Sequence, residues 1–165
     1  MGILQLKSRK FVMELEKIRY TGNKNKRMGH VYADIELING ADLLLAKMHM
    51  IGEDEIKRFP LRILVDTGAH MLAINENIQE VLQVPVRERR KVQLADGRFG
   101  EFDVVGPIDL RFKNRTVNCS AFVLPGNSAP LLGVIPLEEM DVLIDPNIEE
   151  LVVNPEHPYF AQLRL

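Results

Sequence analysis

The chain has 165 residues, of which 46% are hydrophobic and 27% charged, a balance typical of one soluble globular domain with a substantial core. Its formal net charge of −2 argues against nucleic acid as a partner. The single cysteine, Cys119, excludes an intramolecular disulfide and a cysteine-rich metal site, and its alternating surroundings favour a core position. Neither a signal peptide nor a membrane span is recognisable, so we expect no membrane partner and a cytoplasmic location.

Charge is distributed unevenly along the chain. Residues 1–32 hold eight Lys and Arg against two Glu, a net charge of +6, which leaves −8 for the remainder. The first 27 residues end in a polar, basic run, so we expect 1–27 to be a solvated basic extension, with an arm for an anionic partner as the alternative. Their apolar spacing fits a helix and a strand equally. We expect one domain at 28–154 and a C-terminal tail at 155–165.

The first ordered segment predicted is a strand. Apolar and polar side chains alternate over residues 31–37, as in a half-buried strand. Asn39-Gly40 predicts a tight turn after it. Residues 43–51 are apolar enough for either a helix or a strand, and both remain open. Residues 52–57 form an acidic loop that leads into the next strand.

The next segment, Leu61–Ala69, carries the strongest chemical signal. Its apolar run predicts a buried strand, and the run stops at an acid, a hydroxyl and a glycine. Asp66 therefore lies beside the core, where an ionised carboxylate is costly unless something compensates it. Gly68 allows another backbone to approach closely. The pattern indicates a carboxylate that performs chemistry.

A short helix is predicted after this strand. Asn75 or Asn77 can cap it, and Pro85 ends it. Its buried face would consist of Ile78, Val81 and Leu82.

Two hairpins follow. Asp96-Gly97 lies between the strand-like runs 91–95 and 99–105, which is a strong hairpin signal. Alternation on both sides of Asn114 predicts the second hairpin. Together they predict a mainly β domain in which most strands are antiparallel.

The last predicted elements are a short helix and two strands. Pro136 suits the first position of a helix that reaches Met140. The closing strands are expected at residues 142–144 and 151–153. The mainly β fold should therefore contain one or two short helices.

Three motifs in this order resemble the retropepsin-like aspartic proteases, the retroviral-type, single-domain family of the aspartic protease clan. They are Leu64-Val65-Asp66-Thr67-Gly68-Ala69, the hairpin tip Ala95-Asp96-Gly97-Arg98, and Leu131-Leu132-Gly133 followed by Leu137-Glu138-Glu139-Met140. The resemblance covers roughly residues 28–154. It implies a closed antiparallel β barrel of the retropepsin type.

The resemblance also implies an activity, that of an aspartic endopeptidase. In this family two aspartates share one proton and activate a water, because two carboxylates that close cannot both ionise. The chain has one Asp-Thr-Gly and no Asp-Ser-Gly. The resemblance therefore implies a homodimer in which each copy supplies Asp66, with a peptide or protein as the substrate and no cofactor.

Other positions receive roles from the same resemblance. Thr67 would link the two catalytic loops through its hydroxyl, Gly68 would let the loops approach, and Ala69 would complete the turn. Ala95, Asp96, Gly97 and Arg98 would form the tip of a flap that closes over an extended peptide. Leu131, Leu132 and Gly133 would support the catalytic loop.

The chain departs from the family pattern at several places. His70 stands where many retroviral enzymes have a further acid, and we expect it to pack rather than to tune the aspartates. The flap tip has Arg98 and one glycine instead of a glycine pair. The loop at 41–58 is longer than the minimal form, and the tail carries Tyr159 and Phe160.

Other functions are less well supported. The four histidines (His30, His49, His70 and His157) show no metal-ligand spacing, so we expect no metal site. A non-catalytic, dimeric peptide-binding module of the same fold is the alternative, although the intact Asp66-Thr67-Gly68 argues against it. An actin-like ATPase is rejected, because the chain lacks glycine-rich phosphate loops.

Overall fold

The computed structural model describes residues 29–165, so the predicted basic extension at 1–27 lies outside the described residues. The strands are β1 (Tyr32–Asn39), β2 (Arg58–Val65), β3 (Leu72–Asn75), β4 (Val86–Gln93), β5 (Phe99–Phe112), β6 (Arg115–Leu124), β7 (Leu131–Leu132), β8 (Val142–Asp145) and β9 (Glu150–Val153). The helices are α2 (Gly40–Lys47), α3 (Glu76–Leu82) and α4 (Val134–Met140), with a 3-10 turn at Glu53–Glu55. Within residues 29–165 no helix combines the length and the apolar character needed to cross a bilayer.

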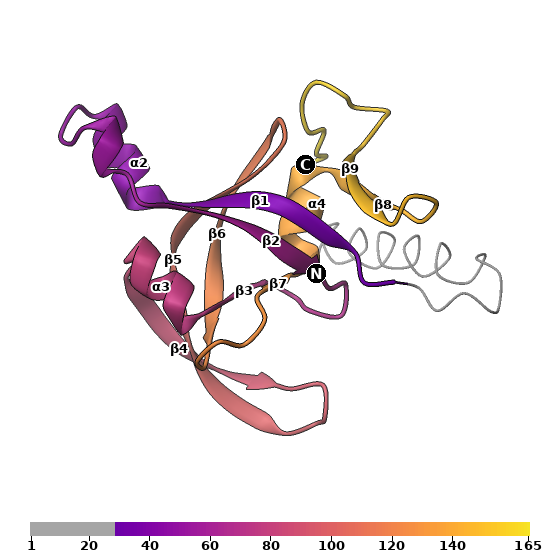
Figure 1. The fold of residues 1–165 in the computed structure, drawn as a ribbon, viewed down its shortest axis with the longest axis horizontal. Helices are drawn as coiled ribbons and strands as arrows, with labels where there is room; N and C mark the ends of the chain where they lie inside the picture. The colour runs from indigo at the N-terminus through magenta and orange to yellow at the C-terminus, as the bar shows by residue number, and fades with distance from the viewer. Residues whose placement is uncertain (1–28) are drawn as a thin grey trace.

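The strands form one curved sheet in the order β4-β5-β6-β3-β7-β2-β1-β9-β8 (Figure 1). Strand β1 also pairs with β5, so six strands are connected in a ring of pairings. The mainly β prediction is confirmed. The sheet is mixed rather than antiparallel throughout, because β9 runs parallel to β1, β7 to β2 and β6 to β3.

Burial along β1 follows the predicted alternation. Ala33, Ile35 and Leu37 are buried, whereas Tyr32 and Asp34 face solvent. The inward side chains join a core that draws residues from β2, β3, β5, β6, α3 and α4. The core therefore packs against both ends of β2, the strand that precedes Asp66.

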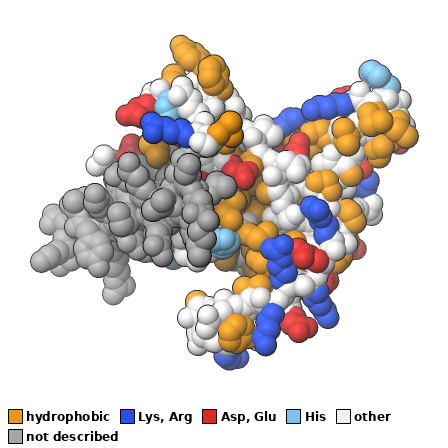
Figure 2. Space-filling view, turned by 180° about the vertical axis from the view of Figure 1, so that it is seen from behind, with side chains coloured by type: hydrophobic (Ala, Val, Ile, Leu, Met, Phe, Trp, Pro, Cys, Tyr) orange, Lys and Arg blue, Asp and Glu red, His pale blue; other side chains and the backbone are white. Residues whose placement is uncertain are grey.

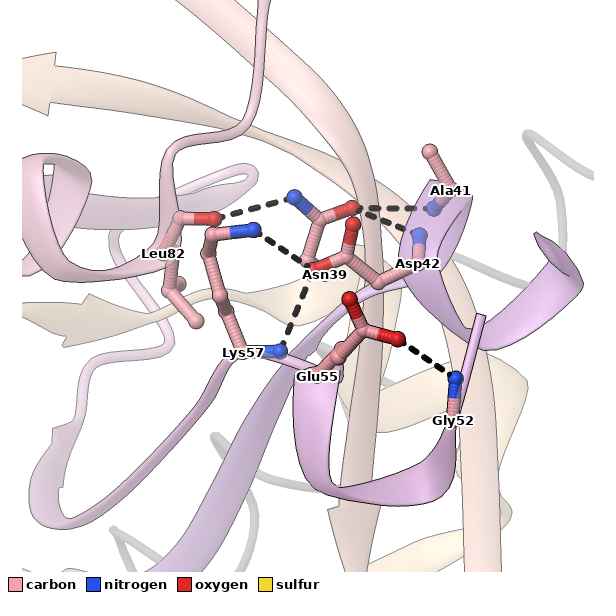
Figure 3. Close-up of polar contacts among 7 residues, drawn as sticks. All are labelled: Asn39, Ala41, Asp42, Gly52, Glu55, Lys57 and Leu82. Atoms are coloured by element: carbon pink, nitrogen blue, oxygen red, sulfur yellow. Dashed lines mark hydrogen bonds and ion pairs between the residues drawn. The ribbon is translucent and has the colours of Figure 1, made fainter. Parts of the chain in front are cut away.

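Asn39 is buried at the end of β1. The tight turn predicted at Asn39-Gly40 was wrong, because helix α2 begins at Gly40. The Asn39 side chain accepts hydrogen bonds from the N–H groups of Ala41 (3.0 Å) and Asp42 (3.1 Å) and thereby caps α2 (Figure 3). Its Nδ2 donates to the carbonyl of Leu82 at 2.9 Å, and its backbone N–H donates to Lys57 at 2.9 Å. The side chain thus joins β1 to α2 and to the end of α3, and the backbone N–H fixes the residue before β2.

Helix α2 resolves the ambiguity at residues 43–51 and brings the described helices to three, more than the one or two predicted. It projects from the sheet (Figure 1), and a small second core of Ile38, Leu43, Ala46 and Ile56 fixes its base. Leu44 in this helix, and Met48 and Met50 in the turn after it, are exposed. Figure 2 shows hydrophobic side chains gathered over this projecting part.

Helices α3 and α4 differ from the predictions in detail. Asn75, one of the two predicted candidates, caps α3. Val81 was predicted on the buried face of this helix, but it is 49% exposed. Helix α4 begins at Val134, so Pro136 is its third residue. The two predicted hairpins share one long strand, because β5 continues from Phe99 to Phe112 without a break.

The C-terminal tail is fastened to the end of α4 by the carboxylate of Asp141. One oxygen accepts a hydrogen bond from Asn154 Nδ2 at 2.9 Å. The other lies 2.6 Å from His157 Nδ1 and accepts the N–H of Gln162 at 3.1 Å. Partial burial would raise the pKa of Asp141, but the bonds from Asn154, Gln162 and His157 outweigh it and keep this pKa below its ordinary value.

The Asn39 cap leads to a prediction about stability. Replacing Asn39 by alanine should lower the free energy of unfolding by about 2–3 kcal/mol, because the substitution removes the cap and leaves the Leu82 carbonyl without its donor. Asn39→Asp should lose at least as much, because it keeps the accepting oxygen but places a buried carboxylate oxygen against the Leu82 carbonyl. Urea unfolding followed by circular dichroism measures both. Asn147→Ala, in the exposed β8–β9 turn, is the control and should change stability by less than about 0.5 kcal/mol. Equal losses at positions 39 and 147 would contradict the assignment.

The tail contact predicts a dependence of stability on pH. Because folding lowers the pKa of Asp141, its contribution is complete above the ordinary carboxyl value of about 3.9 and is lost as the pH falls through the folded-state value. Asp141→Asn should therefore be less stable than the unaltered protein at about pH 5, and the difference should vanish near pH 2. Asparagine tolerates the left-handed backbone at this position (φ 52°), so the comparison isolates the charge. A difference that stays constant over this range would refute the role of Asp141.

Candidate active site

Asp66 follows directly after β2, where the sequence predicted the end of a buried strand. The N–H of Val65 donates to the carbonyl of Val31 at 2.8 Å, and the N–H of Asp66 donates to Leu132 at 3.0 Å. The backbone that carries the carboxylate is therefore held from both sides, by the segment before β1 and by β7. The side chain itself is half-buried.

The three residues after Asp66 form a tight turn closed by the aspartate itself. The N–H of Gly68 donates to Asp66 Oδ1 at 2.9 Å, and the N–H of Ala69 donates to the Asp66 carbonyl at 3.1 Å. The bond from Gly68 orients the carboxylate, and the bond from Ala69 closes the turn. Within the described residues of this single chain, the Thr67 hydroxyl has no hydrogen-bond partner and no second carboxylate is bonded to this turn.

The segment Leu131–Gly133 lies directly against this turn. Leu131 and Leu132 pair in parallel with the last two residues of β2. The first turn of α4 then donates to the loop that follows Asp66, from Val134 N–H to the Ala69 carbonyl and from Ile135 N–H to the His70 carbonyl, both at 3.0 Å. The structure thus brings together two of the three sequence motifs.

Gly133 permits this contact because it has no side chain. A Cβ at position 133 would lie 2.4 Å from the Met71 carbonyl oxygen, 2.7 Å from the Met71 nitrogen and 2.8 Å from the Ala69 carbonyl oxygen. All three are backbone atoms, which cannot move aside without moving the loop. Close approach of two backbones is a standard reason for glycine.

The third motif, Ala95–Arg98, forms the exposed tip of the β4–β5 hairpin. The N–H of Leu94 donates to the Arg98 carbonyl at 2.8 Å, and Gly97 adopts a positive φ of 84°. The Arg98 side chain and N–H bind the carboxylate of Asp96 and lower its pKa. In the part of the chain that the structure describes, no hydrogen bond or ion pair joins this tip to Asp66–Ala69. The hairpin tip and the Asp66–Ala69 loop therefore make no polar contact with each other among the described residues.

The neighbouring reactive groups do not add to the site. The His70 side chain is exposed rather than packed, so the packing predicted for it was wrong. Burial, followed by the carboxylates of Glu139 and Asp109, raises the pKa of the Cys119 thiol to about 12, which makes it a poor nucleophile. No three His, Cys, Asp or Glu side chains within residues 29–165 gather in a way that would hold a metal ion.

Comparison with known proteins identifies the family. A family model described as "gag-polyprotein putative aspartyl protease" matches residues 53–139, a range that includes all three motifs except the last residue of the third, Met140. The chain belongs to this family. The resemblance to retropepsin-like proteases is therefore confirmed, over a shorter range than residues 28–154. No curated protein matches the chain.

One residue that shapes the loop after Asp66, Met71, could not be recognised from the sequence. Met71 leaves no space for a side chain at position 133, through its backbone oxygen and nitrogen. A backbone contact carries no side-chain signal, so the methionine gave no indication of it. The glycine at 133 was the only available clue.

The contact at Gly133 predicts a large effect of a small substitution. Gly133→Ala should lower the free energy of unfolding by about 3 kcal/mol or more, because the added methyl group must displace the backbone of residues 69–71. Chemical unfolding measures the loss. Gly126→Asn is the control: Gly126 has a φ of 57° and open space around it, and asparagine tolerates that conformation. Equal and small losses in both variants would contradict the close contact.

Proposed function

We propose that the protein is an aspartic endopeptidase that acts as a homodimer. The observation that carries the proposal is Asp66, whose carboxylate is oriented by its own turn at the end of β2 and has no second carboxylate beside it in the described chain. Membership of the aspartyl protease family supports the activity. A second copy supplies the missing acid under two-fold symmetry. We further infer that the ring of strand pairings is the closed barrel of this family.

The two Asp66 carboxyl groups share one proton and divide the work. The ionised group removes a proton from the bound water, whose oxygen attacks the scissile carbonyl carbon, while the protonated group donates its proton to the carbonyl oxygen. The resulting tetrahedral intermediate collapses when the amide nitrogen receives a proton and leaves as the amine. Each carboxyl group therefore alternates between base and acid.

The remaining motif residues position these groups. The N–H of Gly68 fixes one carboxylate oxygen of Asp66. The other carboxylate oxygen then faces the Asp66 of the second copy and the water. The Thr67 hydroxyl, without a partner in the described chain, is available to the second copy. The Ala95–Arg98 hairpin tip closes over the substrate and excludes water.

A non-catalytic, dimeric peptide-binding module remains the alternative. Such a module would keep the fold, the flap and the dimer but would not need an oriented acid. The hydrogen bond from Gly68 to Asp66 favours the enzyme, because it organises a carboxylate that a binding module does not use.

Cleavage of a peptide library tests the activity. We expect cleavage at acidic to mildly acidic pH, inhibition by a statine-type transition-state mimic, and a loss of about a thousandfold or more in Asp66→Asn. Asp34→Asn, on the exposed face of β1, is the matched control and should retain activity. Unchanged turnover in Asp66→Asn would refute the enzyme.

A mixing experiment tests the shared site. When the active protein is mixed with an excess of Asp66→Asn, exchange of subunits should lower the activity per active chain, because each mixed dimer contains one Asp66 carboxyl group instead of two. Solution mass by light scattering should be that of a dimer. Activity that does not change on mixing, together with a monomeric mass, would exclude the homodimer.

A further inference from the structure

The first turn of α4 is committed to the loop after Asp66. The opening N–H groups of a helix have no partner inside the helix. Val134 and Ile135 donate theirs to the carbonyls of residues 69–70, both at 3.0 Å, and Pro136 has no N–H to donate. The position of this turn therefore decides where the backbone of the loop lies.

The opposite end of α4 is held by a different segment. The helix has seven residues, Val134–Met140, a length that is not stable in isolation. Asp141 ends it with a left-handed backbone (φ 52°), and the Asp141 N–H donates to the Glu138 carbonyl at 3.1 Å. The Asp141 carbonyl accepts the N–H of Asn154 at 3.2 Å. Burial of its apolar face holds the helix against the core, whereas contacts outside the helix fix both of its ends.

The carboxylate of Asp141 gathers three groups of the C-terminal tail, which crosses the end of α4 (Figure 1). Oδ1 accepts a hydrogen bond from Asn154 at 2.9 Å, and Oδ2 lies 2.6 Å from His157 Nδ1 and accepts the N–H of Gln162 at 3.1 Å. Among the described residues, His157 is the titratable side chain that faces this carboxylate. Hydrogen bonds to an ionised acceptor are stronger than those between neutral groups.

The remaining anchors of the tail are weaker. The Nδ2 of Asn114 donates to two tail carbonyls, at 2.9 and 3.2 Å, and Nη2 of Arg115 donates to the carbonyl of His157. Arg115 is 2% exposed, and its Nε and Nη1 have no hydrogen-bond partner among the described residues. The desolvation of these two donors offsets the bond that Nη2 gains. Asp141 therefore contributes most of the attachment of the tail.

The apolar side chains of the tail do not contribute to its attachment. Tyr159, Phe160 and Leu163 are 83%, 69% and 63% exposed. In the part of the chain that the structure describes, neither hydrophobic core includes a residue beyond Val153. A segment held by a few polar contacts can open locally while the rest of the domain stays folded.

We propose that Asp141 is a positioning residue for Asp66: by fastening the tail to the end of α4 it fixes the helix, and the helix fixes the loop that follows the acid. The inference rests on the proposed endopeptidase function for its effect on turnover, whereas the position of the loop is measurable in an inactive protein. If Asp141 only stabilised the domain as a whole, its loss would loosen every part of the structure equally.

Hydrogen exchange followed by NMR tests the coupling in the full chain carrying Asp66→Asn. At mildly acidic pH, adding Asp141→Asn should accelerate exchange of the Val134 and Ile135 N–H groups by about tenfold relative to the amides of the β5–β6 pairing. Asp145→Asn in β8 is the matched control. It makes the same charge change, keeps an oxygen that accepts the N–H of residue 147, and should leave exchange at 134 and 135 within about twofold.

A second variant approaches the contact from the tail. His157→Ala removes one group from the Asp141 carboxylate and keeps the carboxylate charge, so it should accelerate the same two N–H groups to a smaller extent. The double variant should exchange no faster than Asp141→Asn alone, because both changes act through one attachment. Additive effects would mean that the two residues act separately and would contradict the proposal.

Turnover tests the effect on the acid in the protein that retains Asp66. Asp141→Asn should lower kcat by about tenfold and leave KM within about twofold, because it displaces the acid without changing the surface that binds a peptide. Asp145→Asn should change neither.

The proposal is overturned if exchange at residues 134 and 135 is unchanged, if it rises equally in the Asp145→Asn control, or if all amides accelerate together. Faster exchange with an unaltered kcat would also overturn it, because the loop would then move without affecting the acid. If the unaltered protein cleaves no peptide, the proposed enzyme fails, and the exchange result by itself decides whether Asp141 fixes the loop.

Discussion

The contact between Gly133 and the backbone of residues 69–71 is the constraint on which the candidate active site depends. A two-residue strand, β7, has little pairing of its own, yet it ends where α4 begins and where the catalytic loop turns. Because no Cβ intervenes, the first N–H groups of α4 reach the carbonyls of Ala69 and His70. The loop that carries Asp66 is thereby fixed from the side opposite β1.

The same arrangement shows how one chain by itself holds the Asp66–Ala69 loop. The acid is oriented by the N–H of Gly68, the loop is held by α4, and the hairpin tip remains apart from both. Within the described residues, the Asp66 carboxylate accepts a hydrogen bond from Gly68 alone, and the Thr67 hydroxyl has no partner. A symmetric partner would complete both at once.

Polar side chains hold the peripheral segments, together with the small second core under α2. Asn39 joins α2 to the ends of β1 and α3, and Asp141 fastens the tail to α4. Both lie at helix ends, where backbone groups lack partners within the helix. Segments of this kind are hard to predict from hydrophobic patterns, because a buried asparagine and a turn asparagine look alike in sequence. The error at Asn39-Gly40 arose in this way.

Periodicity in the sequence determined the local elements around the site: β2 and its terminal acid, the β4–β5 hairpin, helix α3 with Asn75 as one of two candidate caps, and the mainly β class. These features depend on neighbours within a few residues, which the sequence displays directly. Tertiary structure alone decided the parallel pairing of β7 with β2 and the contact of Met71 with Gly133. Each is set by backbone approach between segments distant in sequence, and backbone atoms are the same at every residue.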